Sequence, residues 1–259
     1  MPRKSRQISP TGIYHLMARG INREPIFHDD SDRLRYLETL KRISNESDAA
    51  VFGYCLMDNH VHILLKEGET GISKIMHRLG ASYAYYYNLK YERVGHVFQN
   101  RFRSETIKDE KYLLTVIRYI HNNPVKAGKK TKAEEYRWSS CEAYYGGMDV
   151  LPGLTSVDYI LSLFCENTEQ AMKEMQKFNE METEDQCLEE NEDNNEKVLS
   201  DTKACQIIES IVGNRPFSIF HEISKTERDE VLRRLKVKGL SIRQISRLTG
   251  VSFNIVKRA

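Results

Sequence analysis

Two histidines separated by a single residue are the strongest candidates for chemistry in this sequence. They stand in Asp58-Asn59-His60-Val61-His62, between two apolar runs at residues 51–57 and 63–65. Successive side chains of a strand point to opposite faces, so His60 and His62 are expected on one face and Val61 in the core. Such a pair can hold a divalent metal, but two half-exposed strand histidines without a metal would give the same pattern. A third ligand would favour the metal site.

Tyr119 and Asn123 supply a candidate nucleophile and a candidate third ligand. Residues four apart lie on one face of a helix, so a phenol and an amide oxygen would face one site together. Four of the 14 tyrosines have a possible oxygen ligand four residues later. The other three lie in a strand pattern, before two glycines, or ahead of a serine, which is a weak ligand. Tyr119 with Asn123 is therefore the best pair.

The pair requires a helix, and the sequence predicts one from Asp109 to about Asn122. Proline disfavours helical geometry at the residue before it, so Pro124 is expected to end this helix. The predicted apolar stripe consists of Leu113, Val116, Ile117 and Ile120. His121 could contact a DNA strand or have no functional role, and we favour no role. The run Tyr85-Tyr86-Tyr87 could stack bases, but at helical spacing packing is the better interpretation.

The elements that must position these residues follow in a recognisable order. Alternation and helical periodicity predict strands at 13–20, within 51–66 on either side of Asp58-Asn59, and at 96–103, with helices from Asp30 and over 71–91. Strand, helix, strand, strand, helix, strand is the ferredoxin-like split-βαβ arrangement around an antiparallel sheet. The expected fold class is therefore α+β.

Charge divides the chain into three blocks, although the net charge is only +2. Residues 1–146 carry 24 Lys and Arg against 17 Asp and Glu, residues 147–214 carry 4 against 16, and residues 215–259 carry 11 against 4. Two basic blocks around an acidic one suggest two nucleic-acid-facing modules on an acidic connector, the alternative being ordinary solvated surfaces.

Targeting signals and disulfides are not expected. No run of about 18 apolar residues and no basic-then-apolar leader occurs, so the sequence predicts a cytoplasmic protein without a membrane partner. The five cysteines are odd in number and widely spaced, and no Cys-x-x-Cys pair is present. Reduced thiols are therefore expected.

The C-terminal part predicts a separate small module. Residues 148–178 carry helical signals, residues 179–203 are expected to form an acidic, solvated linker, and residues 204–259 resemble a helix-turn-helix of bacterial regulators. The module's helices are expected at 224–239, 241–248 and 252–257, although a plain helical hairpin remains an alternative. Duplex DNA is its expected partner, and the expected contacts are Arg243, Asn254, Lys257 and Arg258.

Over residues 8–147, roughly, the sequence resembles the single-tyrosine HUH transposases (IS200-like transposases), and within them the REP-associated tyrosine transposases. The segments that carry the resemblance are Tyr14-His15-Leu16, Arg19-Gly20, Pro25-Ile26-Phe27, Met57-Asp58-Asn59-His60-Val61-His62-Ile63-Leu64, Gly95-His96-Val97-Phe98-Gln99, Tyr119-Ile120-His121-Asn122-Asn123-Pro124-Val125 and Arg137-Trp138-Ser139-Ser140. Asp58 departs from the family, which often has proline there, and should alter turn rigidity more than chemistry. The resemblance implies an HUH catalytic domain over residues 1–147.

The resemblance also implies an activity, which is cleavage and rejoining of single-stranded DNA beside hairpins. A metal held by His60, His62 and Asn123 would polarise the scissile phosphate, and Tyr119 would attack to give a 5′-phosphotyrosine link and a free 3′-hydroxyl. Mixed nitrogen and oxygen ligands suit Mg²⁺ or Mn²⁺. The candidate DNA contacts in this domain are Arg19, Gly20, Arg23, Arg101 and Arg103, of which Arg19-Gly20 would help recognise a guide next to the hairpin.

Three other functions remain open from the sequence. The first is a catalytically silent DNA-binding transcriptional regulator that uses the same fold and the helix-turn-helix. The second is an HUH nickase of the replication-initiator or relaxase type, which the short chain and the Tyr-x-x-x-Asn spacing argue against. The third is a protein that binds structured RNA on its sheet. The sequence does not determine the DNA target or which metal is used. It also does not determine whether the protein serves a mobile element or its host, or whether it is a monomer or a homodimer.

Overall fold

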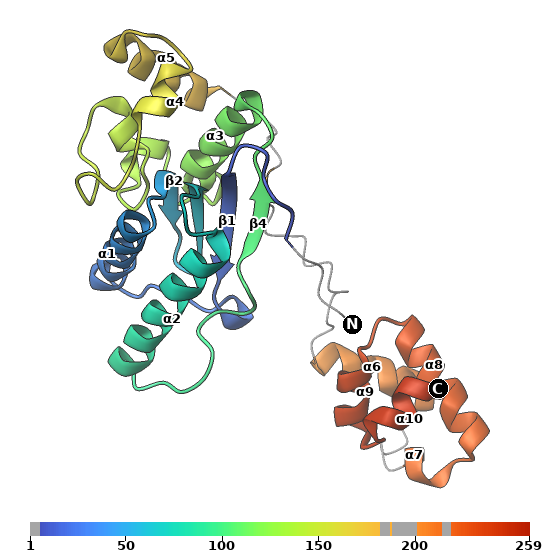
Figure 1. Cartoon of the computed structure of the whole chain (residues 1–259). Helices are drawn as coiled ribbons and strands as arrows, with labels where there is room; N and C mark the ends of the chain where they lie inside the picture. Colours follow the sequence, from blue (N-terminus) through green and yellow to red (C-terminus); the bar gives the residue numbers. More distant parts are fainter. Residues whose placement is uncertain (1–5, 182–186, 188–200, 214–218) are drawn as a thin grey trace. The chain divides into compact units, whose positions relative to one another are not determined.

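The computed structural model describes residues 6–181, 187, 201–213 and 219–259 (Figure 1). The chain divides into two compact units, Met1–Leu188 and Glu189–Ala259. The first unit contains the sheet and the second contains helices.

A four-stranded antiparallel sheet organises the first unit. Its strands are β1 (Ile13–Arg19), β2 (Ala50–Leu56), β3 (His60–Lys66) and β4 (Arg103–Thr106), in the order β2-β3-β1-β4. β1 pairs with both β3 and β4, and β2 pairs with β3. The predicted α+β class with an antiparallel sheet is confirmed, and the strand succession is the one on which the ferredoxin-like interpretation rests.

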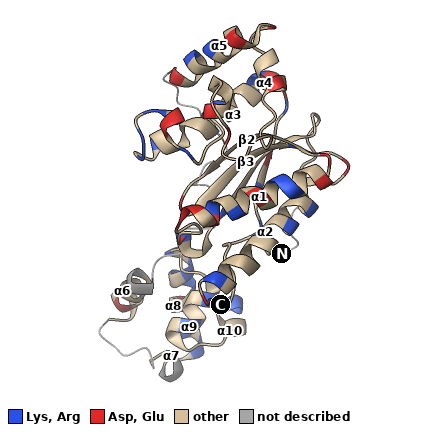
Figure 2. Ribbon diagram, turned by 90° about the vertical axis from the view of Figure 1, so that its left-hand side faces the viewer, with Lys and Arg blue, Asp and Glu red and all other residues tan. Residues whose placement is uncertain are grey.

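Helices cover both faces of the sheet. α1 (Asp30–Glu46) and α2 (Ile72–Lys90) lie on one side, as the two views in Figures 1 and 2 agree. α3 (Glu110–Lys126) packs on the other side, against β2 and β3. A Cβ atom added at Gly53 of β2 would lie 2.3 Å from Cδ1 of Ile117, so the glycine permits this close approach. α3, which carries Tyr119, thus packs closely against the sheet.

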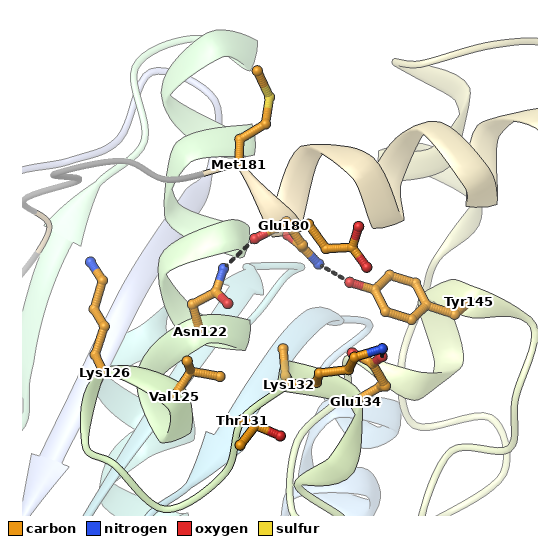
Figure 3. Close-up of a pocket in the computed structure, with 11 residues that line it drawn as sticks. Asn122, Val125, Lys126, Thr131, Lys132, Glu134, Tyr145, Glu180 and Met181 are labelled. Carbon is orange, nitrogen blue, oxygen red and sulfur yellow. Dashed lines mark hydrogen bonds and ion pairs between the residues drawn. The ribbon is translucent and has the colours of Figure 1, made fainter.

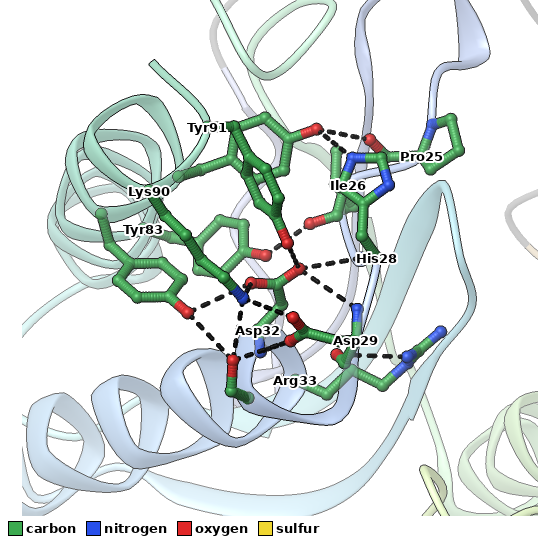
Figure 4. A network of polar contacts seen from close by, with 12 residues as sticks. Pro25, Ile26, His28, Asp29, Asp32, Arg33, Tyr83, Lys90 and Tyr91 are labelled. Atoms are coloured by element: carbon green, nitrogen blue, oxygen red, sulfur yellow. Dashed lines mark hydrogen bonds and ion pairs between the residues drawn. The ribbon is translucent and has the colours of Figure 1, made fainter. Parts of the chain in front are cut away.

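A polar network closes the start of α1 against the end of α2 (Figure 4). Asp29 caps α1, and its carboxylate and that of Asp32 both lie 2.7 Å from Nζ of Lys90. Asp32 is fully buried and also accepts hydrogen bonds from the Tyr91 hydroxyl at 2.7 Å and the His28 backbone N–H at 2.8 Å. A buried carboxylate with this many donors is stable in its ionised form.

The turn between β2 and β3 forms where it was predicted, around Asp58-Asn59. The N–H of Met57 donates to the carbonyl of His60 at 2.9 Å, closing the hairpin. The short 3-10 helix η1 (Ile21–Arg23) follows β1 and lies beside this turn, since the N–H of Gly20 donates to the carbonyl of Asn59 at 2.8 Å.

The predicted strand over residues 96–103 is wrong in its position. β4 begins at Arg103, and Val97 to Gln99 instead run beside the end of β1 with a single bridge between Gly20 and Phe98. The hydrogen bonds of this stretch join Ile21 N to Val97 O and Gln99 N to Arg19 O, both at 2.9 Å. The alternation that suggested a strand reflects this short pairing and the burial of Val97, after which the chain leaves the sheet and returns at Arg103.

The predicted end of the third helix is also wrong. α3 continues through Pro124 to Lys126, because proline lacks only its own donor and the last turn is closed by Ala127 N to Asn123 O at 3.0 Å. Asn123 is therefore held within the helix.

An extension follows α3 and covers the outer edge of β2. It contains η2 (Ala133–Glu135), η3 (Glu142–Tyr145), α4 (Asp158–Ser162) and α5 (Thr168–Glu180). Backbone bonds run from Leu56 N to Trp138 O, from Ser140 N to Tyr54 O and from Ser156 N to Val51 O. The predicted helical extension at 148–178 is thus packed against the domain that contains the sheet and shares its core.

The predicted linker over 179–203 begins and ends differently in the structure. Asn179 and Glu180 belong to α5, and Asn179 is buried with only 3% of its surface exposed. α6 begins at Asp201, inside the predicted linker. Residues 182–186 and 188–200, where most of the predicted linker falls, lie outside the described residues. α5 itself carries both acidic and basic side chains (Figure 2).

The second unit has its own small core. Its helices are α6 (Asp201–Val212), α7 (Ile219–Glu222), α8 (Lys225–Val237), α9 (Ile242–Thr249) and α10 (Phe253–Arg258). As predicted, the side chains of Ser224 and Ser241 cap α8 and α9. Gly250 has φ of 73° directly after α9, which suits a glycine C-cap. The buried core residues include Leu232, Leu235, Ile245 and Val256.

Within the described parts of the chain, no helix is both long and apolar enough to cross a membrane. None of the five cysteines, all of which are described, forms a disulfide.

Candidate active site

His60 and His62 lie on the face of the sheet that α3 covers. In the antiparallel register, His60 stands opposite Arg19 and His62 opposite Met17. Both histidines are buried, with 4% and 0% of their surface exposed. The predicted placement on one face, with Val61 in the core, agrees with this register.

The two histidines converge on the side chain of Asn123. His60 Nε2 lies 3.4 Å from Asn123 Oδ1, and His62 Nε2 lies 3.4 Å from Asn123 Nδ2. The imidazole rings are perpendicular, with 5.1 Å between their centroids. The structure thus brings together the three predicted metal ligands.

The tautomer of His60 can be assigned from its neighbours. The Asn59 amide donates from Nδ2 to the Arg23 carbonyl at 3.1 Å, which turns its Oδ1 toward His60 Nδ1, 2.6 Å away. An oxygen that only accepts requires a proton on that nitrogen, so a neutral His60 has its lone pair on Nε2. This lone pair faces Asn123 Oδ1, which is also an acceptor.

Two lone pairs facing each other within a buried site are better satisfied by a cation than by each other. Neighbouring ligands of an octahedral Mg²⁺ are about 3 Å apart, close to the 3.4 Å between His60 Nε2 and Asn123 Oδ1. The donor set therefore fits a divalent ion. Over the described residues no group of three or more His, Cys, Asp or Glu is placed to hold a metal, so a site here depends on the Asn123 amide.

Tyr119 is placed next to the histidines by α3. Its ring centroid lies 5.7 Å from that of His62, and 7% of its surface is exposed. Lys126, two turns further along the helix, holds its Nζ 5.0 Å from the centroid of the Tyr119 ring. The site thus combines a phenol, two imidazoles, an amide and a cation.

Three site residues were missed by the sequence-based predictions: Lys126 on α3, His15 on β1 and Glu105 on β4. His15, on β1, has its Nε2 2.9 Å from His62 Nδ1, and its Nδ1 3.5 Å from Oε2 of Glu105 on β4. Tyr14-His15-Leu16 was noticed as part of the family pattern, but His15 was given no role. The signal that could have found it is the strand register, because His15 and His62 are diagonal neighbours on one face.

Burial determines the protonation of this histidine pair. Complete burial lowers the pKa of His62 well below its ordinary value, and the nearby His60, His15 and Arg19 lower it further. Burial also lowers the pKa of His15, although Glu105 opposes that shift. Both rings are therefore neutral at pH 7.

The predicted DNA-contact arginines separate into two groups. Arg19 lies opposite His60 and Arg103 lies opposite Met17, which places both on the histidine face. Arg101 precedes β4, so it does not lie on the strand that carries Arg103. Arg101 instead lines an apolar pocket of about 340 Å³ with residues of β1, α1 and α2. Arg23 is exposed, and its backbone φ of 62° is left-handed.

Gly20 has a structural requirement of its own. A Cβ atom at this position would lie 2.1 Å from the carbonyl oxygen of Glu24. Any side chain would force η1 away from the turn before His60. The structure thus gives Gly20 a steric role, beside the DNA contact predicted from the sequence.

His121 faces away from the candidate site, in keeping with the preference for no functional role. It is fully buried, its Nε2 is 3.1 Å from Ser140 Oγ, and its Nδ1 is 3.1 Å from Asn179 Nδ2. Burial lowers the pKa of His121 to about 3, so it is a neutral packing residue that ties α3 to α5.

A pocket of about 490 Å³ lies beside the C-terminal half of α3 (Figure 3). Asn122 and Lys126 line it from α3, Tyr145 from η3, and Glu180 from the end of α5. Its wall is fixed by the bond from Asn122 Nδ2 to the Asn179 carbonyl at 2.8 Å. The pocket adjoins the tyrosine helix but contains none of the predicted catalytic residues.

In the second unit, the predicted duplex contacts fall on two short helices. Arg243 is on α9, and Asn254, Lys257 and Arg258 are on α10. Asn254, Lys257 and Arg258 are exposed.

The fold and the site define an α+β domain whose sheet presents two histidines to a tyrosine-bearing helix. Residues 9–123 match the protein family described as "Transposase IS200 like". The resemblance to the IS200-like transposases that the sequence predicted is thus confirmed over residues 9–123.

Similar solved structures were also found. The structure of a REP-associated tyrosine transposase bound to a REP hairpin has 16% sequence identity and a TM-score of 0.48, and the match covers 61% of this chain and 96% of that chain. A candidate transposase from Deinococcus radiodurans has 17% identity and a TM-score of 0.33, with 47% and 97% covered. A search of the curated proteins found no match.

Proposed function

We propose that this protein is a single-tyrosine HUH transposase that cleaves and rejoins single-stranded DNA near hairpins. The observation that supports it most is the convergence of His60 Nε2 and His62 Nε2 on the Asn123 amide, one helical turn from Tyr119. A structural role alone would not require two buried imidazoles to direct ring nitrogens at one amide.

His60, His62 and Asn123 would hold Mg²⁺ or Mn²⁺, which when bound polarises the scissile phosphate. The Tyr119 oxygen attacks phosphorus, forming the 5′-phosphotyrosine bond as the bond to the 3′-oxygen breaks. The phenol proton is lost and the 3′-oxygen gains one, so the bond energy is kept for rejoining to another 3′-hydroxyl. The Lys126 ammonium, close to the ring, stabilises negative charge that develops on the phenol.

DNA binding divides between the two units. On the histidine face Arg19 and Arg103 would contact phosphates next to the scissile bond, while Arg23 and Arg101 would contact the strand further away. The helix-turn-helix formed by α9 and α10 would bind duplex DNA, with Arg243, Asn254 and Lys257 among its contacts. The substrate would then be a single strand beside a hairpin.

The test is cleavage of a labelled single-stranded library containing hairpins, with Mn²⁺ or Mg²⁺ against EDTA. The wild type is compared with Tyr119→Phe and with Tyr85→Phe, which removes the hydroxyl of an exposed tyrosine on α2. We expect a covalent protein–DNA adduct that requires the metal, is absent in Tyr119→Phe and is kept in Tyr85→Phe. Binding without cleavage or adduct would favour the silent regulator instead.

A further inference from the structure

We propose that His15 and Glu105 are positioning residues that set the tautomer of His62 and thereby direct its Nε2 lone pair into the site. The meaning of that lone pair rests on the proposed function, in which His62 is a metal ligand. The tautomer itself is a property of the protein without metal.

The contact between His15 and His62 forces a choice between two proton positions. The nitrogens His15 Nε2 and His62 Nδ1 are 2.9 Å apart, and both rings are fully buried. Two neutral rings at this distance share one proton, so one nitrogen donates and the other accepts. If His62 donates, its lone pair is on Nε2. If His15 donates, a neutral His62 carries its proton on Nε2, which cannot then be a ligand.

Glu105 decides between these alternatives. It stands directly opposite His15 in the β1–β4 register, with its Oε2 3.5 Å from His15 Nδ1. This is longer than a normal hydrogen bond, but Nδ1 is buried and has no closer hydrogen-bond partner among the described residues. A carboxylate only accepts, so it favours a proton on Nδ1 and leaves Nε2 of His15 as the acceptor.

The remaining contacts agree with this direction of donation. The Tyr112 hydroxyl donates to Glu105 Oε1 at 2.6 Å, which holds the carboxylate in place. At the far end of the series, the Asn123 amide nitrogen lies 3.4 Å from His62 Nε2 and would need an acceptor there. In this arrangement the Tyr112 hydroxyl and His15 Nδ1 both point a proton at the Glu105 carboxylate. His62 Nδ1 donates to His15 Nε2, and the Asn123 amide nitrogen faces the acceptor Nε2 of His62.

The two histidines obtain their tautomers from different neighbours. His60 is set by Asn59, on the turn, whereas His62 is set by His15 and Glu105 through the sheet. Ligand histidines commonly donate their second nitrogen to a carboxylate or a carbonyl, and loss of that partner costs about 10–100-fold in metal affinity. A change at His15 should therefore alter His62 and leave His60 as it was.

The experiment uses the full-length protein labelled with ¹⁵N-histidine and without metal. Long-range ¹H–¹⁵N spectra distinguish protonated from unprotonated ring nitrogens. We expect His62 to be protonated at Nδ1 in the wild type, and His15→Leu to shift the proton toward Nε2 without a change at His60. Mn²⁺ affinity, measured by titration calorimetry without DNA, should fall about 10–100-fold in His15→Leu.

The matched control is His121→Leu, which removes another fully buried imidazole, outside the site. It should leave the His62 tautomer and the Mn²⁺ affinity unchanged, although both variants lose stability. Should His15→Leu fail to fold, Glu105→Leu takes its place, because that side chain is 29% exposed. Glu105→Gln, which keeps an acceptor oxygen, should restore the wild-type tautomer.

The proposal is overturned if wild-type His62 is protonated at Nε2, or if the folded His15→Leu or Glu105→Leu variant keeps both the tautomer and the Mn²⁺ affinity of the wild type. Failure of the proposed function looks different. In that case wild-type protein neither binds Mn²⁺ nor forms a DNA adduct, while the tautomer measured without metal still decides the role of His15 and Glu105.

Discussion

Asp58 and Lys129 form an ion pair, with 2.5 Å between Oδ2 and Nζ, that joins the turn before His60 to the segment just after α3. The other carboxylate oxygen of Asp58 lies 2.7 Å from Nη2 of Arg33 on α1. Asp58 therefore links the turn before His60 to the segment just after α3 and to α1, which lies on the other face of the sheet.

Replacing Asp58 by Asn should reduce activity more than stability. Its side chain is 46% exposed, and exposed ion pairs contribute about 1 kcal/mol or less. The position of His60 relative to Asn123, by contrast, depends on the turn and α3 being joined. We expect a small loss in the free energy of unfolding, measured with urea, and a several-fold loss in the rate of adduct formation. A double-mutant cycle with Lys129→Met should be non-additive, and full additivity would argue against the linkage.

The Asp32 network predicts an acid-sensitive stability. Burial by itself would raise the pKa of Asp32, but the hydrogen bonds from Lys90, the His28 N–H and Tyr91 outweigh it, and the pKa is lowered. A lowered carboxyl pKa adds stability above the unfolded-state value of about 3.9. That stability is lost as the pH falls through the folded-state pKa.

Asp32→Asn should therefore be less stable by about 3 kcal/mol at pH 7, because Lys90 loses its buried partner. Below about pH 4 its stability should depend less steeply on pH than that of the wild type. Urea unfolding of both proteins between pH 2.5 and 7 measures the difference. Parallel curves across this range would show that Asp32 is not the titrating group.

Gly20→Ala should destabilise the first unit by about 1–3 kcal/mol, since the new methyl group would meet the Glu24 carbonyl. Gly71→Ala is the matched control. Gly71 has φ of −62°, and the atom nearest to an added Cβ is a carboxylate oxygen at an ordinary 3.7 Å. Chemical denaturation compares the two variants. A Gly20→Ala protein as stable as Gly71→Ala would mean that η1 moves freely away from the turn.

Lys257→Met should weaken the binding of duplex DNA about equally across sequences. If Lys257 contacts one phosphate, the slope of log affinity against log salt concentration should fall in magnitude by about 0.9. Fluorescence anisotropy at several salt concentrations gives this slope. Lys225→Met, at the start of α8, is the control, and an equal change in both variants would remove the assignment of α10 as the DNA-facing helix.

Strand alternation and helical spacing predicted those features of the fold that depend on residues close together in the sequence. The alternation around Val61 correctly predicted that His60 and His62 share one face of the sheet. The four-residue spacing of Tyr119 and Asn123 correctly predicted that they lie one turn apart on a helix. The start of β4 could not be predicted, because Val97 and Phe98 satisfy the same alternation through a short pairing with the end of β1.

Long-range register explains what was missed at the site. His15 and Glu105 are 90 residues apart in the sequence. The pairing of β1 with β3 brings His15 next to His62, and its pairing with β4 brings Glu105 next to His15. The continuation of α3 through Pro124 likewise depends on packing, since the helix is held against β2 and β3 on one side and α5 on the other.

The covered edge of β2 has a consequence for how copies of this protein can meet. An open edge strand is a template for pairing with another chain, and it favours aggregation or sheet extension between molecules. Here the outward-facing groups of Val51, Tyr54 and Leu56 already bond to the segment that follows α3. A second molecule cannot add a strand along β2 unless it displaces that segment. The extension thus blocks edge-to-edge pairing of two molecules through β2.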